Sequence, residues 1–282
     1  MGVFAKHQDQ VGYGHTYDLW KNGKWSEIFI ERDRNVGYGI WEDFVSFDSA
    51  VDAAAATVRY GSGGQRIYID ASSTVAPITG LIGGGVRLFN TADDEECWMQ
   101  WGGITGAPFC ISDSAPHELI LEFVFKINAI TDSKSGWFMG LMQEGCAAAD
   151  TIADAGTLAD KDYLGFHRLE GDGDKLDIVY KLAGQTAVVH KADWMTLTAD
   201  TWYKVGLRFN EIAKTITPYY GVGTGATAMI EDTANKITAT DIASATDIFP
   251  DAEEMNVIVG GKNASADDAY LDLGFVGCLQ WR

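Results

Sequence analysis

The sequence lacks any long hydrophobic run. Its first eight residues contain no apolar stretch of signal-peptide length, and no later run approaches the length of a membrane span. Lys6 stands where a myristoylation signal has serine or threonine. These absences predict a protein that is made and assembled inside a cell and that has no membrane as a direct partner.

Positive charge is also scarce. The chain has 21 Lys and Arg against 40 Asp and Glu, which gives a formal net charge of -19 at pH 7. So acidic a surface repels phosphate groups, which excludes nucleic acid and anionic lipid as direct partners. The ordinary role of such a coat is to keep a protein soluble.

Cysteine and histidine are few, and neither occurs at the spacing of a known site. Cys97, Cys110, Cys146 and Cys278 form no CxxC pair and have no histidine at ligand spacing, so we predict free, buried thiols rather than a zinc site. The five histidines form no HExxH pair. The glycine run 83–85 is not followed by the Lys-Ser or Lys-Thr of a phosphate-binding loop.

Helix-favouring sequence is nearly absent, with residues 52–56 as the one clear stretch in the first hundred residues. Strand-like runs fill the chain instead. The longest, residues 118–128 and 135–142, are rich in β-branched and aromatic residues and predict a hairpin at the centre of a sheet. Further runs are expected at 40–47, 57–60, 66–70, 85–90, 97–101, 108–111, 163–169, 175–182, 186–191, 201–209, 214–220, 255–260 and 269–281.

These runs are short and regularly spaced, with glycine-rich or acidic turns between them, which predicts one all-β sandwich or barrel over residues 41–282. The runs 163–169, 175–182 and 186–191 predict an antiparallel meander. Residues 1–40 differ, because aromatics, glycines and basic residues alternate there without a periodic core face. We interpret this segment as an extended arm; the alternative is an ordinary first hairpin that turns at Asn22 and Gly23.

Several motifs, taken in order, resemble the concanavalin A-like, laminin-G-like jelly roll. They are Trp-Glu-Asp-Phe at 41–44, Trp-Phe-Met-Gly-Leu at 137–141, Trp-Tyr-Lys-Val-Gly-Leu-Arg-Phe at 202–209 and the closing apolar run 271–281. The resemblance implies an all-β jelly-roll β-sandwich over residues 41–282. Together with the arm it resembles bacteriophage virion proteins that decorate heads or build tails.

That second resemblance implies a capsid decoration protein of the virion, assembled in the host cytoplasm, with the major capsid protein or other virion proteins as partners. A closed homo-oligomer such as a trimer is expected. The arm would bury apolar side chains on its neighbour. The expected anchors are Phe4, Trp20, Trp25, Phe29 and Ile30.

The alternative function is that of a carbohydrate-binding module or lectin, because the jelly-roll family includes lectins. Lectins stack sugars on exposed aromatic rings. The candidates are Trp98, Trp101, Trp194 and Tyr219. Trp98 and Trp101 are three apart in one strand, so their rings fall on opposite faces and one should point outward or lie at an interface.

The family also includes glycosidases, which use two carboxylates on one face of a strand. The stretch nearest to that motif is 175–180, and Asp177 is the one carboxylate in it. Glu118 and Glu122 lie on one face of the 118–128 strand, but the residue between them on that face is Ile120, where the motif has a carboxylate. We therefore predict that the chain is not an enzyme. No cofactor is expected. Two acidic groups offer oxygen ligands for a structural calcium ion; they are Asp172, Asp174 and Asp177, and Asp267, Asp268 and Asp272.

Overall fold

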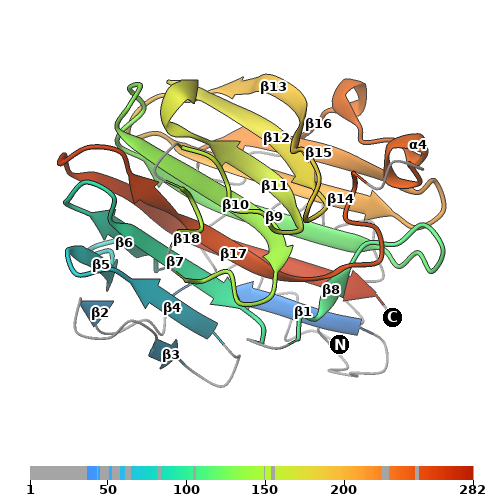
Figure 1. The fold of residues 1–282 in the computed structure, drawn as a ribbon, viewed down its shortest axis with the longest axis horizontal. Coiled ribbons are helices and arrows are strands. Elements are labelled where there is room, and N and C mark those ends of the chain that lie inside the picture. Colours follow the sequence, from blue (N-terminus) through green and yellow to red (C-terminus); the bar gives the residue numbers. More distant parts are fainter. Residues whose placement is uncertain are drawn as a thin grey trace.

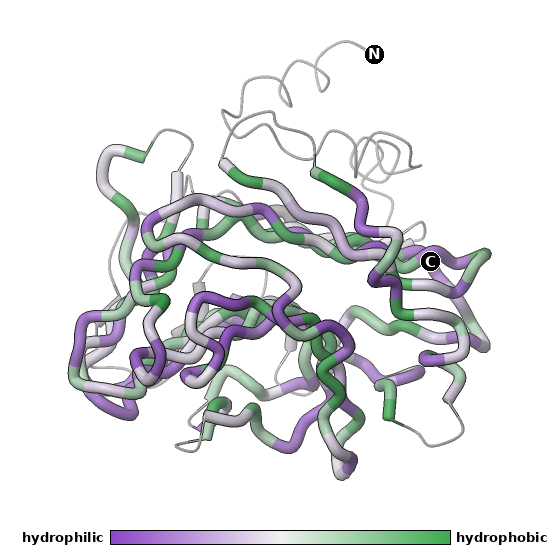
Figure 2. Tube along the Cα trace, turned by 90° about the horizontal axis from the view of Figure 1, so that it is seen from above, coloured by the Kyte–Doolittle hydropathy of each residue, from purple (hydrophilic) through white to green (hydrophobic). Residues whose placement is uncertain are grey.

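The computed structural model describes residues 37–42, 44, 51–52, 58–60, 65–81, 84–103, 106–148, 150–153, 156–223, 229–244 and 248–281. Nearly all of the regular structure in these ranges is β-strand, and two antiparallel sheets lie face to face (Figure 1). Turned by 90°, the chain is seen in layers (Figure 2). The expected all-β sandwich is confirmed. None of the described helices is long and apolar enough to cross a membrane.

The first sheet, called sheet A below, holds the two ends of the described chain side by side. β1 pairs with the second half of β18, and β6 pairs with its first half. The spatial order is β16 (Ile230–Glu231), β15 (Thr215–Val222), β14 (Trp202–Asn210), β9 (Leu119–Ile127), β18 (Ala269–Trp281), β6 (Val86–Asn90), β5 (Ser73–Pro77) and β2 (Val51–Asp52), with β1 (Gly37–Glu42) beside β18.

The second sheet, sheet B, begins with a meander of four consecutive strands, β10 to β13. The part of this meander that the sequence predicts is confirmed. The spatial order is β13 (Val188–Thr196), β12 (Lys175–Lys181), β11 (Tyr163–Arg168), β10 (Ser135–Gln143), β17 (Glu254–Asn263), β7 (Glu96–Trp101), β4 (Gln65–Ile69) and β3 (Val58–Tyr60), with β8 (Phe109–Cys110) beside β17.

The expected hairpin between residues 118–128 and 135–142 is wrong. β9 pairs with β14 and β18 in sheet A, whereas β10 pairs with β11 and β17 in sheet B. The polar link between them therefore crosses from one sheet to the other. Two apolar strands that follow each other can pair side by side or stack face to face, and both arrangements need the same side-chain pattern.

The inner faces of the two sheets share one large core. On β10 the side chains of Trp137, Met139 and Leu141 belong to it, whereas Phe138 and Met142 belong to a second cluster on the opposite face. Alternation along the strand explains the division, because successive side chains point to opposite faces. The central strands of sheet B are therefore buried on their outer face as well, which an ordinary sandwich would leave to solvent.

Other expected elements agree with the structure to within a few residues. The described ranges also contain a helical turn, α4 (Ala239–Ile242), and two 3-10 turns, η1 (Glu170–Asp172) and η2 (Thr233–Asn235). β5 was missed, because Ser-Thr-Val-Ala-Pro carries only one large apolar side chain. Of the helix-favouring residues 52–56, Asp52 lies in strand β2 instead, and 53–56 lie outside the described residues, as do residues 43 and 45–47 of the first expected strand.

Candidate functional site

The outer face of sheet B is sealed by the segment that follows β10. Cys146, Ala147 and Ile152 from this segment pack on Trp98 and Phe138 of the sheet. All five are buried, and Trp98 is 0% exposed. Such a contact removes apolar surface from water on a face that would otherwise be wet. We call residues 144–148 and 150–153 the covering segment.

Glu96 ties the covering segment to the sheet. Its carboxylate accepts hydrogen bonds from Trp98 Nε1 at 2.7 Å and from the backbone N–H groups of Thr151 and Ile152, each at 3.2 Å. Burial raises the pKa of this carboxyl to about 7, although the three hydrogen bonds and Lys262 oppose the rise. A buried carboxyl that titrates near neutral pH is a common feature of functional sites, and ion-pair networks produce it as well.

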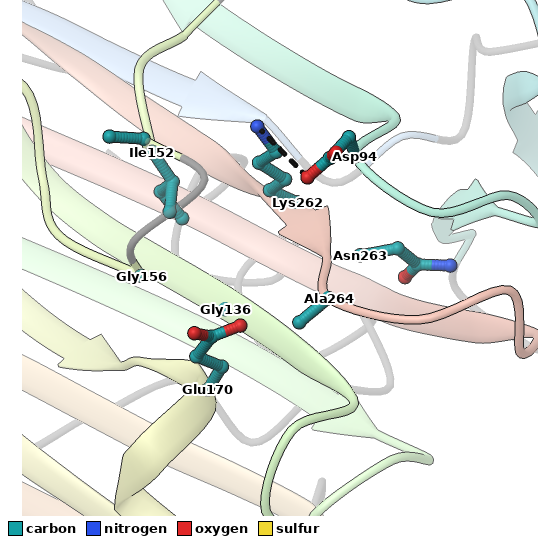
Figure 3. Close-up of a pocket in the computed structure, with 9 residues that line it drawn as sticks. Asp94, Gly136, Ile152, Gly156, Glu170, Lys262, Asn263 and Ala264 are labelled. Carbon is teal, nitrogen blue, oxygen red and sulfur yellow. Dashed lines mark ion pairs between the residues drawn. The ribbon is translucent and has the colours of Figure 1, made fainter.

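A small pocket lies beside the covering segment (Figure 3). Lys262 and Asp94 form an ion pair across it, with 3.5 Å between Nζ and Oδ1, and Glu170 lies on another side. The cavity measures about 10 Å³, which is room for one water molecule at most. It is too small for a sugar or any other organic ligand.

A larger pocket opens where β1, β8 and the end of β18 meet. Its volume is about 340 Å³, within the range of small-molecule sites. Tyr38 and Trp281, both half-buried, contribute aromatic side chains, and His117 at the rim is exposed. Ser112 and Ser114 add hydroxyl groups. Apolar rings beside a few polar groups are the usual lining of a ligand site.

Two sets of hydrogen bonds hold the walls of this larger pocket. The Gln280 side chain accepts from Cys110 N–H at 2.9 Å and donates to the Cys110 carbonyl, which joins β18 to β8. Ser112 Oγ lies 3.0 Å from Ser114 Oγ and accepts from the Ala115 N–H at 3.3 Å. The walls are thus fixed by contacts within the protein. The sequence analysis missed this pocket because its residues come from four separate parts of the chain.

A histidine and two aspartates gather at the opposite end of sheet B. His167 on β11 lies directly opposite Asp177 on β12, and Asp172 comes from η1 between them. His167 Nε2 lies 3.4 Å from Asp177 Oδ2 and 3.9 Å from Asp172 Oδ2. One ligand atom from each residue lies within 4.8 Å of the others. The structure therefore joins two of the predicted acidic ligands to a histidine that the sequence analysis left out.

With the exception of Asp268, the remaining predicted calcium ligands form ion pairs with lysine or arginine. Asp174 pairs with Lys175 at 2.9 Å, and Asp267 forms an ion pair with Lys134. Asp272 is fully buried; Arg87 Nε lies 2.6 Å from its Oδ1 and Lys126 Nζ 3.1 Å from its Oδ2. These ion pairs occupy carboxylate oxygens that a cation would need, so none of the three aspartates supports a calcium site.

Replacing Asp272 by asparagine should lower the free energy of unfolding by about 2 kcal/mol, because Arg87 and Lys126 lose a buried counter-ion. Both cations are partly exposed, which keeps the loss below that of a fully buried pair. Asp267→Asn should cost clearly less, because solvent screens the exposed pair with Lys134. Urea unfolding of both variants checks this; equal losses would contradict it.

The predicted sugar-stacking aromatics do not lie together on an exposed surface. Trp101 is 2% exposed in the main core, and Trp98 faces outward from its sheet but lies under the covering segment. Trp194 stacks on Phe166 at 5.2 Å between ring centroids, and its Nε1 donates to Asp232. Tyr219 is 9% exposed. These rings seal the sandwich, and none of the four forms an open platform for a sugar.

The carboxylates considered for glycosidase chemistry are engaged elsewhere. Glu118 accepts from Arg208 Nε at 2.7 Å. Glu122 is fully buried, and its charge opposes the fall that burial causes in the pKa of Lys204. The arm residues Phe4, Trp20, Trp25, Phe29 and Ile30 lie outside the described residues. The boundary expected at residue 40 falls within β1, and the division into arm and domain stays a prediction.

No protein-family model matches the sequence, and no curated protein is similar to it. Solved structures do match. Lectin II from Ulex europaeus is 10% identical, with a TM-score of 0.50 over 87% of this chain and 98% of that chain. The chain has the concanavalin A-like jelly-roll fold. The predicted fold is thereby confirmed, and the low identity means that this likeness shows the fold alone.

Two further lectins are similar to this jelly roll. Peanut lectin, in a structure with a nine-residue peptide, is 8% identical with a TM-score of 0.49 over 86% of this chain and 97% of that chain. The seed lectin of Lotus tetragonolobus is 13% identical with a TM-score of 0.47 over 79% of this chain and 96% of that chain.

Proposed function

We propose that this jelly roll is a carbohydrate-binding module, and that its sugar site is the larger pocket beside Tyr38 and Trp281. The single observation that carries the proposal is that pocket, whose volume of about 340 Å³ suits one or two sugar rings. Two aromatic side chains and several hydroxyl and imidazole groups line it. A sugar ring has an apolar face and a polar rim, and this lining offers a partner to each.

The lectin likeness supports the same proposal at the level of the fold. The Ulex, peanut and Lotus proteins are lectins by name, and what they bind is transferred to this chain only as part of the proposal. Glu118, Glu122 and Asp177 each have a protein partner, so none of the three is offered as a catalytic group. Binding without catalysis is the function proposed.

Replacing Trp281 or His117 by alanine should weaken sugar binding at least about tenfold, the equivalent of 1.4 kcal/mol. A glycan array with the full chain identifies the sugar, and titration calorimetry with that sugar measures both variants. Trp202→Ala is the control, because Trp202 lies near Lys126 and away from the pocket. Silence across the array, or equal affinities for all variants, would overturn the proposal.

Display on a virus particle stays a prediction, as do the capsid partners and the trimer. The interactions that would attach the chain are expected in residues 1–40, and only 37–40 of these are described. Mass spectrometry of density-purified particles checks the prediction, since a decoration protein would co-purify near the copy number of the shell protein. A chain found only in the soluble fraction would contradict it. A many-copy display of weak sugar sites would raise the avidity of the particle.

A further inference from the structure

We propose that His167, Asp172 and Asp177 bind a first-row divalent metal ion such as Zn²⁺ at the end of the β11–β12 hairpin. One atom of each side chain lies within 4.8 Å of the other two. Donor atoms about 2.1 Å from a shared metal lie about 3 to 3.5 Å apart. The observed separations from His167 Nε2, 3.4 and 3.9 Å, need only a small side-chain rotation to reach that range.

Within the described ranges, the two carboxylates of this cluster have too few cationic partners to neutralise them. The ion pairs of Asp172 and Asp177 within the described ranges are both with His167, which has one imidazole for two carboxylates. Arg168 is close, but its guanidinium donates to the carbonyl groups of Thr131, Ser135 and Gly173.

His167 gives a second observation, because its imidazole is nearly buried and its Nε2 is directed into the cluster. The side chain is 9% exposed, and Nε2 lies 3.4 Å from the nearest carboxylate oxygen, which is longer than an ordinary N–H···O hydrogen bond. A cation at Nε2 replaces this long contact by a direct bond and attracts both carboxylates. The ring proton is then on Nδ1.

The two carboxylates are already held in place by backbone groups. Asp193 N–H donates to Asp177 Oδ1 at 2.8 Å and leaves Oδ2 facing the histidine. Leu169 N–H donates to Asp172 Oδ2 at 2.6 Å. Hydrogen bonds of this kind fix ligand orientation in metal sites. The ligands therefore need little reorganisation when an ion binds.

The donor set selects the class of ion. Ca²⁺ takes six to eight oxygen ligands, whereas one imidazole nitrogen and two carboxylate oxygens suit Zn²⁺ or Mn²⁺. The structural calcium expected from Asp172 and Asp177 is thereby replaced by a different ion. Three protein ligands leave a coordination position open to water or a small anion.

The metal site and the proposed sugar pocket lie at opposite ends of sheet B. The pocket includes Cys110, which pairs with Glu254 at the start of β17. The hairpin end lies near Ser135, which pairs with Asn263 at the end of β17. The two proposals can therefore fail separately.

Calorimetry and thermal unfolding of the EDTA-treated full chain test the metal proposal, with ZnCl₂, MnCl₂ and CaCl₂ as the probes. We expect one Zn²⁺ per chain and a rise in Tm of about 4 to 8 °C at a hundredfold excess over Kd. Asp177→Asn keeps the shape of the side chain and should remove both effects, as should His167→Gln. Asp174→Asn, which changes the same turn at a carboxylate paired with Lys175, should keep them.

Three outcomes would overturn the metal site. They are no response of the wild-type chain to Zn²⁺ or Mn²⁺, a response to Ca²⁺ alone, and a Zn²⁺ response that Asp177→Asn and His167→Gln leave unchanged. Circular dichroism without metal shows whether each variant is folded, so a lost response is not mistaken for a lost fold. Sugar binding by Asp177→Asn should equal that of the wild type.

Discussion

Replacing Trp98 by alanine is expected to lower the free energy of unfolding by about 3 to 5 kcal/mol, the range for truncation of a fully buried tryptophan. Trp98 is 0% exposed between sheet B and the covering segment, and its Nε1 donates to Glu96. The variant loses this apolar contact and leaves the Glu96 carboxylate with one donor fewer. The loss is a large fraction of the total stability of an ordinary domain.

Urea unfolding measures this loss, and limited proteolysis shows where it acts. Cleavage within residues 144–153 should become faster in Trp98→Ala than in the wild type, because the segment loses its main apolar contact. Trp202→Ala is the matched control, since this tryptophan is half-buried and contacts Lys126 at the surface. A loss below about 1 kcal/mol for Trp98→Ala would show that the covering segment does not seal the sheet.

Glu96 should make the protein less stable as the pH rises from about 4.5 to about 7. Its pKa is near 4.5 in the unfolded chain and about 7 in the folded protein. Between these values the folded state binds more protons than the unfolded state, so the contribution is full below pH 4.5 and is lost as the pH rises to 7. The pKa difference corresponds to about 3 kcal/mol.

Other carboxyl groups also titrate in this range, so the measurement compares the wild type with Glu96→Gln. The stability of the wild type relative to this variant should fall by about 3 kcal/mol between pH 4.5 and pH 8. Glu95→Gln is the control, because the Glu95 carboxylate accepts from Ser72 N–H in an exposed setting. A difference between wild type and Glu96→Gln that stays constant with pH would show that Glu96 ionises normally.

Both predictions attribute a large part of the free energy of unfolding to the contacts between the covering segment and sheet B. The sequence of residues 146–160 is rich in small and acidic residues, which by itself favours a plain loop. The burial of this segment depends on Trp98 and Phe138, which lie on two different strands, β7 and β10. No local pattern marks a loop that packs on a distant strand.

The strand pattern was the most predictable part of the molecule. β18 spans residues 269–281 as expected, and β11, β12 and β14 begin and end within one residue of their predicted bounds. Alternation and turn residues act within a few positions of one another, so they can be read along the chain. β5 was missed because its small side chains give little such signal.

The candidate sites were only partly predictable. Asp172 and Asp177 were expected as ligands, and the register of the β11–β12 hairpin, counted back from its turn, could have added His167. The larger pocket could not be found in this way, since Tyr38, His117 and Trp281 are separated by most of the chain. One of Trp98 and Trp101 was expected to point outward or lie at an interface. The structure shows that Trp98 is the one that points away from the main core, but its cover was not foreseen.

The sequence by itself determined the β-strand content and the positions of most strands along the chain, because both follow from local side-chain patterns and turn residues. Only the tertiary structure decided that β9 and β10 belong to different sheets, that the outer face of sheet B is covered, and which residues meet at the pocket and the metal cluster. The physical reason is that pairing and burial depend on contacts between distant residues. One side-chain pattern is compatible with several such arrangements, and the packing of the whole chain selects among them.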